Sequence, residues 1–161
     1  MIVVADTSPL NYVVQLDLIE ELRVIYGHIV LPSAVRQEML HPKAPESVCR
    51  WAASLPDWVE LKRPSALDPT LSLALGAGER EAISLALELH PSILLIDDLR
   101  GRIAAAERSI PVTGTLTVLM QAALLAHLDF DLKLEELRQL GFRASEPVVE
   151  RIRERFSNNQ G

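Results

Sequence analysis

Acidic residues follow two apolar segments of this chain of 161 residues. Asp6 comes directly after residues 2–5, and Asp97 and Asp98 come directly after residues 93–96. Short continuous apolar segments of this kind are typical of buried strands in a parallel sheet. The carboxyl ends of such strands lie at one edge of the sheet, where α/β proteins bind their ligands. We therefore expect these three carboxyl groups at one ligand-binding edge.

Two glutamates lie on apolar helix faces, which are expected to pack against the sheet near the same edge. Glu79 falls in the first turn of a helix predicted over residues 79–89. The residues three, four and seven positions after it are apolar: Ala82, Ile83 and Ala86. Such a face packs inward, so Glu79 is expected to point toward the sheet. Glu38 also shares a helix face with apolar residues, whereas Glu81 lies on a more mixed face.

Carboxyl groups gathered at one sheet edge repel one another and lose hydration, which raises their pKa values. A divalent cation resolves this conflict, and hard oxygen ligands suit Mg²⁺ or Mn²⁺. Such ions polarise a phosphate and activate water for in-line attack. Taken singly, each acid has an ordinary structural explanation, such as a helix cap, a charge at a helix N-terminus or a strand-ending turn. Their joint placement favours a metal site.

The elements that must position these acids alternate along the chain. Strands are predicted over residues 2–5, 28–31, 58–61, 93–96 and 111–113. Helices are predicted from the cap Ser8 onward and over residues 16–22, 34–40, 45–55, 79–89, 100–108, 115–127, 132–140 and 146–156. This alternation predicts an α/β fold of three layers, with a central parallel sheet between helices. We expect a single domain over residues 1–156 and a frayed tail over residues 157–161.

Composition excludes several classes of protein. Hydrophobic residues make up 48% and charged residues 24%, the balance of a globular chain rather than a disordered one. The net charge of −6 argues against a protein that coats nucleic acid by overall charge, but not against a nuclease that holds cations. Cys49 is the single cysteine, which suits the reducing cytoplasm. The longest apolar stretch, residues 116–128, is too short to cross a membrane, so no membrane association is expected.

Five short motifs, in order, resemble the PIN-domain superfamily, and within it the branch of predicted nucleic-acid-binding proteins related to VapC-type toxins. The likeness extends from Met1 to about Phe142. The motifs are Asp6-Thr7-Ser8-Pro9-Leu10, Pro32-x-x-Val35-x-x-Glu38, Leu75-Gly76-x-Gly78-Glu79-x-Glu81-Ala82-Ile83, Leu94-Leu95-Ile96-Asp97-Asp98-x-x-x-Arg102 and Val112-x-Gly114-Thr115-Leu116. Each motif alone is weak evidence, whereas five in order are specific.

The resemblance implies a compact α/β/α fold and a ribonuclease that depends on Mg²⁺ or Mn²⁺. It implies an acidic site made of four residues: Asp6, Glu38, Glu79 and Asp97. Two assignments stay open. Many relatives carry Asp directly before the alanine of the third motif, a position that corresponds to Glu81 rather than Glu79. The acid of the fourth motif is Asp97 or Asp98, and the spacing to the following arginine favours Asp97.

Three further residues are candidates for support of the site. Thr7 and Thr115 are expected to bind water or a site carboxylate, and Arg102 to contact phosphate or a carboxylate. The leading hypothesis is the toxin of a toxin–antitoxin pair, with RNA as substrate, an antitoxin protein as partner and a homodimer as the assembly. The alternative is a PIN-like module that binds RNA or protein without cleaving. A phosphoaspartate enzyme fits less well, because the second position after Asp6 holds Ser8 rather than an acid.

Overall fold

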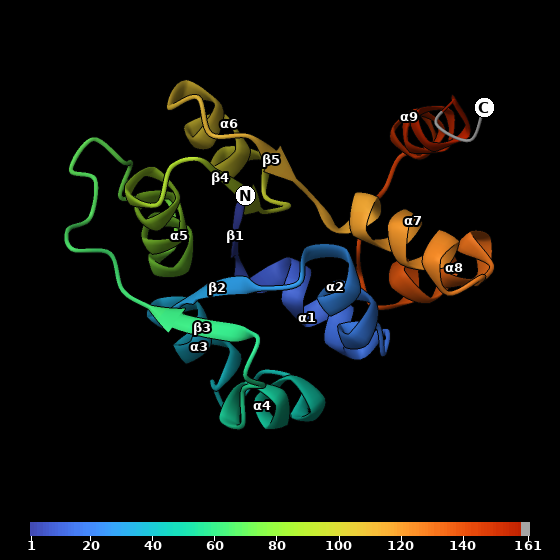
Figure 1. Ribbon diagram of the computed structural model, residues 1–161, viewed down its shortest axis with the longest axis horizontal. Helices are drawn as coiled ribbons and strands as arrows, with labels where there is room; N and C mark the ends of the chain where they lie inside the picture. Colours follow the sequence, from blue (N-terminus) through green and yellow to red (C-terminus); the bar gives the residue numbers. More distant parts are fainter. Residues whose placement is uncertain (159–161) are drawn as a thin grey trace.

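A sheet of five parallel strands forms the centre of the molecule, as described by a computed structural model for residues 1–158 (Figure 1). The strand order is β3-β2-β1-β4-β5. The strands are β1 (Ile2–Ala5), β2 (Ile29–Pro32), β3 (Val59–Lys62), β4 (Ser92–Leu95) and β5 (Val112–Thr113). Because side chains alternate along a strand, Val3 and Ala5 of β1 pack into one hydrophobic core and Val4 into another. The parallel sheet is therefore buried on both faces, which explains the continuous apolar segments.

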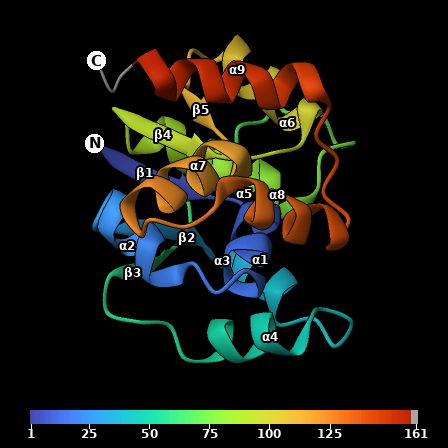
Figure 2. The same cartoon turned by 90° about the vertical axis from the view of Figure 1, so that its right-hand side faces the viewer.

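Helices cover the two faces unequally. The core that contains Val4 is completed by α5 (Ala77–Glu88) and α6 (Leu99–Glu107). The opposite core is completed by α1 (Thr7–Gln15), α2 (Ile19–Tyr26), α4 (Glu46–Ala53), α7 (Thr115–Leu125), α8 (Phe130–Gln139) and α9 (Glu146–Ser157). The short α3 (Ser33–Met39) contacts both α1 and α5. Figure 2 shows α4 and α9 at opposite ends of the molecule. The predicted three-layer α/β/α fold is confirmed.

The register of the sheet brings the acidic residues to one edge. β1 and β4 pair from Ile2 opposite Ser92 to Ala5 opposite Leu95. The backbone N–H of Asp6 continues this pairing, at 2.9 Å from the carbonyl oxygen of Leu95. Asp6 and Asp97 therefore leave neighbouring strands at the same carboxyl edge, where ligands of α/β proteins bind.

Several boundaries differ from those predicted. The first helix begins at Thr7, so Ser8 lies inside it and is not its cap. The second helix begins at Ile19 rather than residue 16, because the chain turns at Asp17, which has a positive φ of 57°. The last helix continues through Ser157, the first residue of the expected tail. Residues 159–161 of that tail lie outside the described residues. Within residues 1–158, no helix has both the length and the apolarity needed to cross a bilayer.

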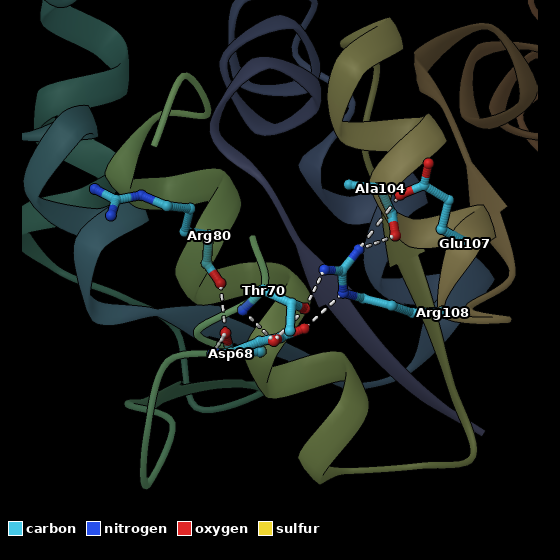
Figure 3. Close-up of polar contacts among 7 residues, drawn as sticks. Asp68, Thr70, Arg80, Ala104, Glu107 and Arg108 are labelled. Atoms are coloured by element: carbon cyan, nitrogen blue, oxygen red, sulfur yellow. Dashed lines mark hydrogen bonds and ion pairs between the residues drawn. The ribbon is translucent and has the colours of Figure 1, made fainter. Parts of the chain in front are cut away.

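An ion pair fixes the loop that leads into α5 (Figure 3). Arg108, at the end of α6, places Nε 2.6 Å from Oδ2 of Asp68 and Nη2 2.7 Å from the hydroxyl of Thr70. Both charged side chains are largely buried, with 14% and 16% of their surfaces exposed. The loop residues Leu71 and Leu75 are buried in the core beneath α5 and α6. The loop is thus held both by the ion pair of Arg108 with Asp68 and by the burial of its apolar side chains.

Replacing Arg108 by alanine should lower the free energy of unfolding by about 2 kcal/mol, because several charge-assisted hydrogen bonds are lost at once. Hydrogen bonds from Arg108 and Thr70 lower the pKa of Asp68 to about 2. The ion pair therefore stabilises the fold fully above the ordinary pKa of 3.8 and loses this effect as pH falls toward 2. Urea unfolding of Arg108→Ala and of wild type at several pH values measures both effects. Arg100→Ala, an exposed change on the same helix, is the control. Equal losses of stability in the two variants would contradict this role of Arg108.

Candidate active site

Asp6 is the most deeply buried acid of the sheet edge. Only 4% of its surface is exposed, and its Oδ1 atom is buried without a hydrogen-bond partner. It occupies the position before α1, yet its side chain makes no capping hydrogen bond to that helix. The simple explanation of Asp6 as a helix cap therefore fails. A buried carboxylate oxygen without a partner is costly, so its presence requires another explanation.

The electrostatics around Asp6 identify its neighbours. Burial is the largest effect and raises the pKa of Asp6 from 3.8 to about 7. The backbone N–H of Thr7 offsets part of the rise, and the charges of Glu79, Glu38 and Asp97 add to it. The three other acids named by the sequence motifs thus lie close enough to Asp6 to raise its pKa. This is the arrangement that a bound cation relieves.

Glu38 reaches the site from α3. Its Oε1 atom accepts a hydrogen bond of 3.0 Å from the backbone N–H of Gly78, and its Oε2 atom accepts one from the hydroxyl of Thr7. Thr7 thus contacts a site carboxylate, one of the two roles expected for it. Although Glu38 as a residue is exposed, its carboxylate is held between α1 and α5.

Asp97 is held by the start of α7. Its Oδ1 and Oδ2 atoms accept hydrogen bonds from the backbone N–H and the hydroxyl of Thr115, at 2.8 and 2.6 Å. Burial raises the pKa of Asp97, while the Thr115 hydrogen bonds and the charge of Arg102 lower it in part. Arg102 is itself fixed by a hydrogen bond of 3.0 Å from Nε to the carbonyl oxygen of Ile96. Thr115 therefore positions the carboxylate of Asp97, and the charge of Arg102 lowers its pKa.

Glu79 points inward from the first turn of α5, as its helix face predicts. Its neighbours on that face are fully buried: Ala82, Ile83 and Ala86. Burial raises the pKa of Glu79, and the charges of Asp98 and Glu38 raise it further. Its Oε2 atom is buried without a hydrogen-bond partner. Glu79 and Asp6 are thus the two site acids that each keep a free, buried oxygen.

The two alternative acids serve as helix caps. Oε1 of Glu81 accepts a hydrogen bond of 3.0 Å from the backbone N–H of Ala34 at the start of α3. Oδ1 of Asp98 accepts from the backbone N–H groups of Arg100 and Gly101 and so caps α6. Asp98 is also exposed. Glu79 therefore differs from Glu81 in keeping a buried oxygen without a partner. Asp97 differs from Asp98 in being less exposed and in raising the pKa of Asp6.

Three glycines make room for the site carboxylates. A Cβ atom at Gly78 would lie 2.6 Å from Oε2 of Glu38. One at Gly101 would lie 2.4 Å from Cδ1 of Ile96 and 2.9 Å from Oε2 of Glu79. At Gly114 it would lie 2.9 Å from Nη2 of Arg102 and 3.0 Å from Oδ1 of Asp97. Sequence reasoning assigned no such role to Gly101. Its place inside a helix, where glycine is unfavourable by about 1 kcal/mol, was the available signal.

Replacing Gly78 by alanine should reduce activity strongly while leaving the fold intact. The added methyl displaces the carboxylate of Glu38, the flexible end of a side chain, so the structural cost is small. Alanine also favours helix by up to about 1 kcal/mol. We expect activity to fall on the order of 10²-fold, as for loss of one electrostatic contact in an active site. Gly76→Ala is the matched change two residues away: its Cβ would meet Oε1 of Glu79 only at an ordinary contact distance of 3.4 Å, so activity should fall much less. A loss of stability that parallels the loss of activity would contradict this explanation.

The donor set suits a hard divalent cation. Carboxylate oxygens are the ligands that Mg²⁺ and Mn²⁺ prefer, and two of them here are buried and unpartnered. Over residues 1–158, no three Asp, Glu, His or Cys side chains converge closely enough to hold an ion as they stand. Carboxylates repel one another without a counter-charge. Binding would therefore draw these side chains together.

Comparison with known protein families decides the classification. The model of the family DUF3368, described as a PIN domain, matches residues 2–158. The chain belongs to this PIN-domain family. PIN domains are commonly nucleases and typically use divalent metal ions. The resemblance seen in the sequence motifs is thereby confirmed.

A solved structure shares the PIN fold. It is a PilT N-terminus domain protein, SSO1118, from the hyperthermophilic archaeon Sulfolobus solfataricus P2. The two chains superpose with a TM-score of 0.54 and 17% sequence identity, over 76% of this chain and 93% of the other. At this identity the likeness shows the fold alone. Comparison with curated proteins gave no match.

Proposed function

We propose that this PIN-domain protein is a metal-dependent ribonuclease that hydrolyses RNA phosphodiester bonds. The observation that carries the proposal is Asp6, buried with an unpartnered oxygen and surrounded by three further carboxylates. Buried carboxylates that repel one another do not stabilise the fold. A module that only binds RNA or protein therefore gains nothing from such a cluster. The family supports the same conclusion, since PIN domains are commonly nucleases.

The residues divide into two roles. Asp6 and Glu79 would hold Mg²⁺ or Mn²⁺ through their free oxygens, with Glu38 and Asp97 completing the acidic site. Such an ion supplies positive charge to the phosphodiester and lowers the pKa of water. Thr7 and the backbone of Gly78 orient Glu38, and Thr115 orients Asp97. Arg102 lies beside Asp97 and offers a guanidinium to a phosphate oxygen. No covalent nucleophile from the protein is required.

We further propose that the enzyme acts in the cytoplasm as the toxin of a toxin–antitoxin pair and forms a homodimer. The sequence resemblance to VapC-type proteins supports this role. Apolar side chains exposed at and after the end of α7 suit a second copy of the chain: Leu124, Leu125 and Leu128. A dimer mass in light scattering would support the assembly, and a monomer mass would contradict it.

Cleavage of single-stranded and hairpin RNAs in Mg²⁺, Mn²⁺ or EDTA tests the nuclease directly. Wild type should cleave with either metal and not in EDTA, and Asp57→Asn, an exposed change far from the motifs, should behave like wild type. RNA binding without cleavage under every metal condition would replace this proposal with the non-catalytic binding module.

A further inference from the structure

A cleft of about 690 Å³ lies beside the acidic site, between the start of α7 and the segment that joins α8 to α9. Figure 1 shows these three helices together at one end of the molecule. One wall of the cleft contains Asp97, Arg102 and Thr115, and the other contains Arg138 and Arg143. Because Asp97 and Thr115 belong to both the site and the cleft, the two are continuous.

The charge of this cleft is opposite to that of the whole chain. Its walls carry three arginines and a single acid, whereas the chain has a net charge of −6. Arg138 pairs with Glu146 at 3.1 Å and donates to the carbonyl oxygen of Ala144, so its guanidinium already has partners and stabilises the wall of the cleft. Among the described residues, neither Arg102 nor Arg143 forms a salt bridge, and Arg143 is exposed. Two guanidinium groups are therefore available to an anion.

The cleft is also partly apolar. Phe142 lines it and packs edge-to-face against Tyr12, with ring centroids 5.3 Å apart. Val148 and Ile152 of α9 extend the apolar wall. A basic groove with apolar and aromatic side chains is the combination that binds single-stranded nucleic acid, because phosphates meet the charges and bases meet the apolar wall. An acidic peptide matches the charges equally, but its carboxylates are not the group on which the adjoining acidic site is proposed to act, whereas a phosphodiester is.

We propose that this cleft binds the strand next to the scissile bond, with Arg143 and Arg102 contacting a phosphate adjacent to the one cleaved. The inference rests on the proposed nuclease function and assigns a substrate subsite to it. The arginines offset the repulsion that the acidic site exerts on the strand. They thereby direct the following phosphodiester toward Asp6, Glu79 and Asp97.

Binding of a short fluorescein-labelled single-stranded RNA, followed by fluorescence anisotropy in Mg²⁺, tests the subsite. All proteins carry Asp6→Asn so that RNA is not consumed. Adding Arg143→Ala should raise Kd on the order of tenfold and reduce the slope of log Kd against log salt concentration by about 0.7, the value for one phosphate contact on a single strand. Arg143→Lys should retain most of the affinity. Arg151→Ala removes the same charge from an exposed position of α9 outside the cleft, so it should change neither quantity.

Several outcomes decide the proposal. Equal behaviour of Arg143→Ala and Arg151→Ala would overturn it. Displacement of the RNA by polyglutamate as effectively as by unlabelled RNA would also overturn it, in favour of an acidic peptide. With Asp6 intact, RNA cleavage whose KM does not depend on Arg143 would refute the subsite but leave the nuclease standing. RNA binding that depends on Arg143, without any metal-dependent cleavage, would support the subsite and refute the nuclease.

Discussion

Replacing Asp6 by asparagine should abolish RNA cleavage and, at the same time, stabilise the metal-free protein. We expect activity to fall on the order of 10³-fold or more, because an amide neither balances the charge of a cation nor binds it as tightly as a carboxylate. Stability should change in the opposite direction, because the buried Asp6 carboxylate has an unpartnered oxygen and three acidic neighbours. Opposite effects on function and stability are typical of residues retained for chemistry.

The stabilisation should depend on pH with a defined sign. The pKa of Asp6 rises from 3.8 to about 7 on folding, so the folded protein binds this proton more tightly than the unfolded chain. Wild type therefore loses stability as pH rises from about 4 to about 7, by at most about 4 kcal/mol at 1.36 kcal/mol for each pKa unit. Asparagine avoids this loss but still buries an amide. We therefore expect the free energy of unfolding of Asp6→Asn at pH 8 to exceed that of wild type by about 2 kcal/mol.

Urea unfolding in EDTA across this pH range measures the effect. The difference between Asp6→Asn and wild type should be small near pH 4 and reach its full size above pH 7. Adding Mg²⁺ should stabilise wild type and not the variant, because the ion binds the folded carboxylates. Asp57→Asn, an exposed change, should show neither effect. A variant less stable than wild type at pH 8 in EDTA would show that Asp6 is a structural residue.

Replacing Glu79 by glutamine should lower activity, whereas the same replacement of Glu81, on the same helix, should lower stability. Glu79→Gln removes a charge whose Oε2 atom is buried and free, so activity should fall on the order of 10²-fold or more. Glu81→Gln keeps an oxygen that can still accept from the backbone N–H of Ala34, so most activity should remain. The second change should instead lower the free energy of unfolding by about 0.5 to 1 kcal/mol, because a charged cap of α3 becomes neutral.

Steady-state cleavage rates and urea unfolding of both variants provide the measurement. Glu81→Ala extends the series, because it removes the cap altogether and should destabilise the protein further. Loss of activity in Glu81→Gln with full activity in Glu79→Gln would reverse the assignment of the third site acid. That result would require α5 to rotate relative to the sheet when the metal binds.

The sequence determined the fold class and the edge at which the acids lie. Continuous apolar segments predict buried parallel strands, and an acid directly after such a segment lies at its carboxyl end whatever the packing. Asp6 and Asp97 were placed in this way. The inward direction of Glu79 also followed from the sequence, because the residues at helical spacing from it are apolar. These inferences are local, and local periodicity is what a sequence displays directly.

Contacts between distant segments were decided only by the tertiary structure. Glu81 accepts a hydrogen bond from the backbone N–H of Ala34, 47 residues earlier, and Arg108 pairs with an aspartate 40 residues away. The contact of Gly101 with Glu79 likewise joins two different helices. Cap and turn signals gave no guidance on which acid is left free, because Glu79 and Glu81 are alike in type. Packing decides this, since it satisfies one carboxylate with a backbone N–H and leaves the other buried without a partner.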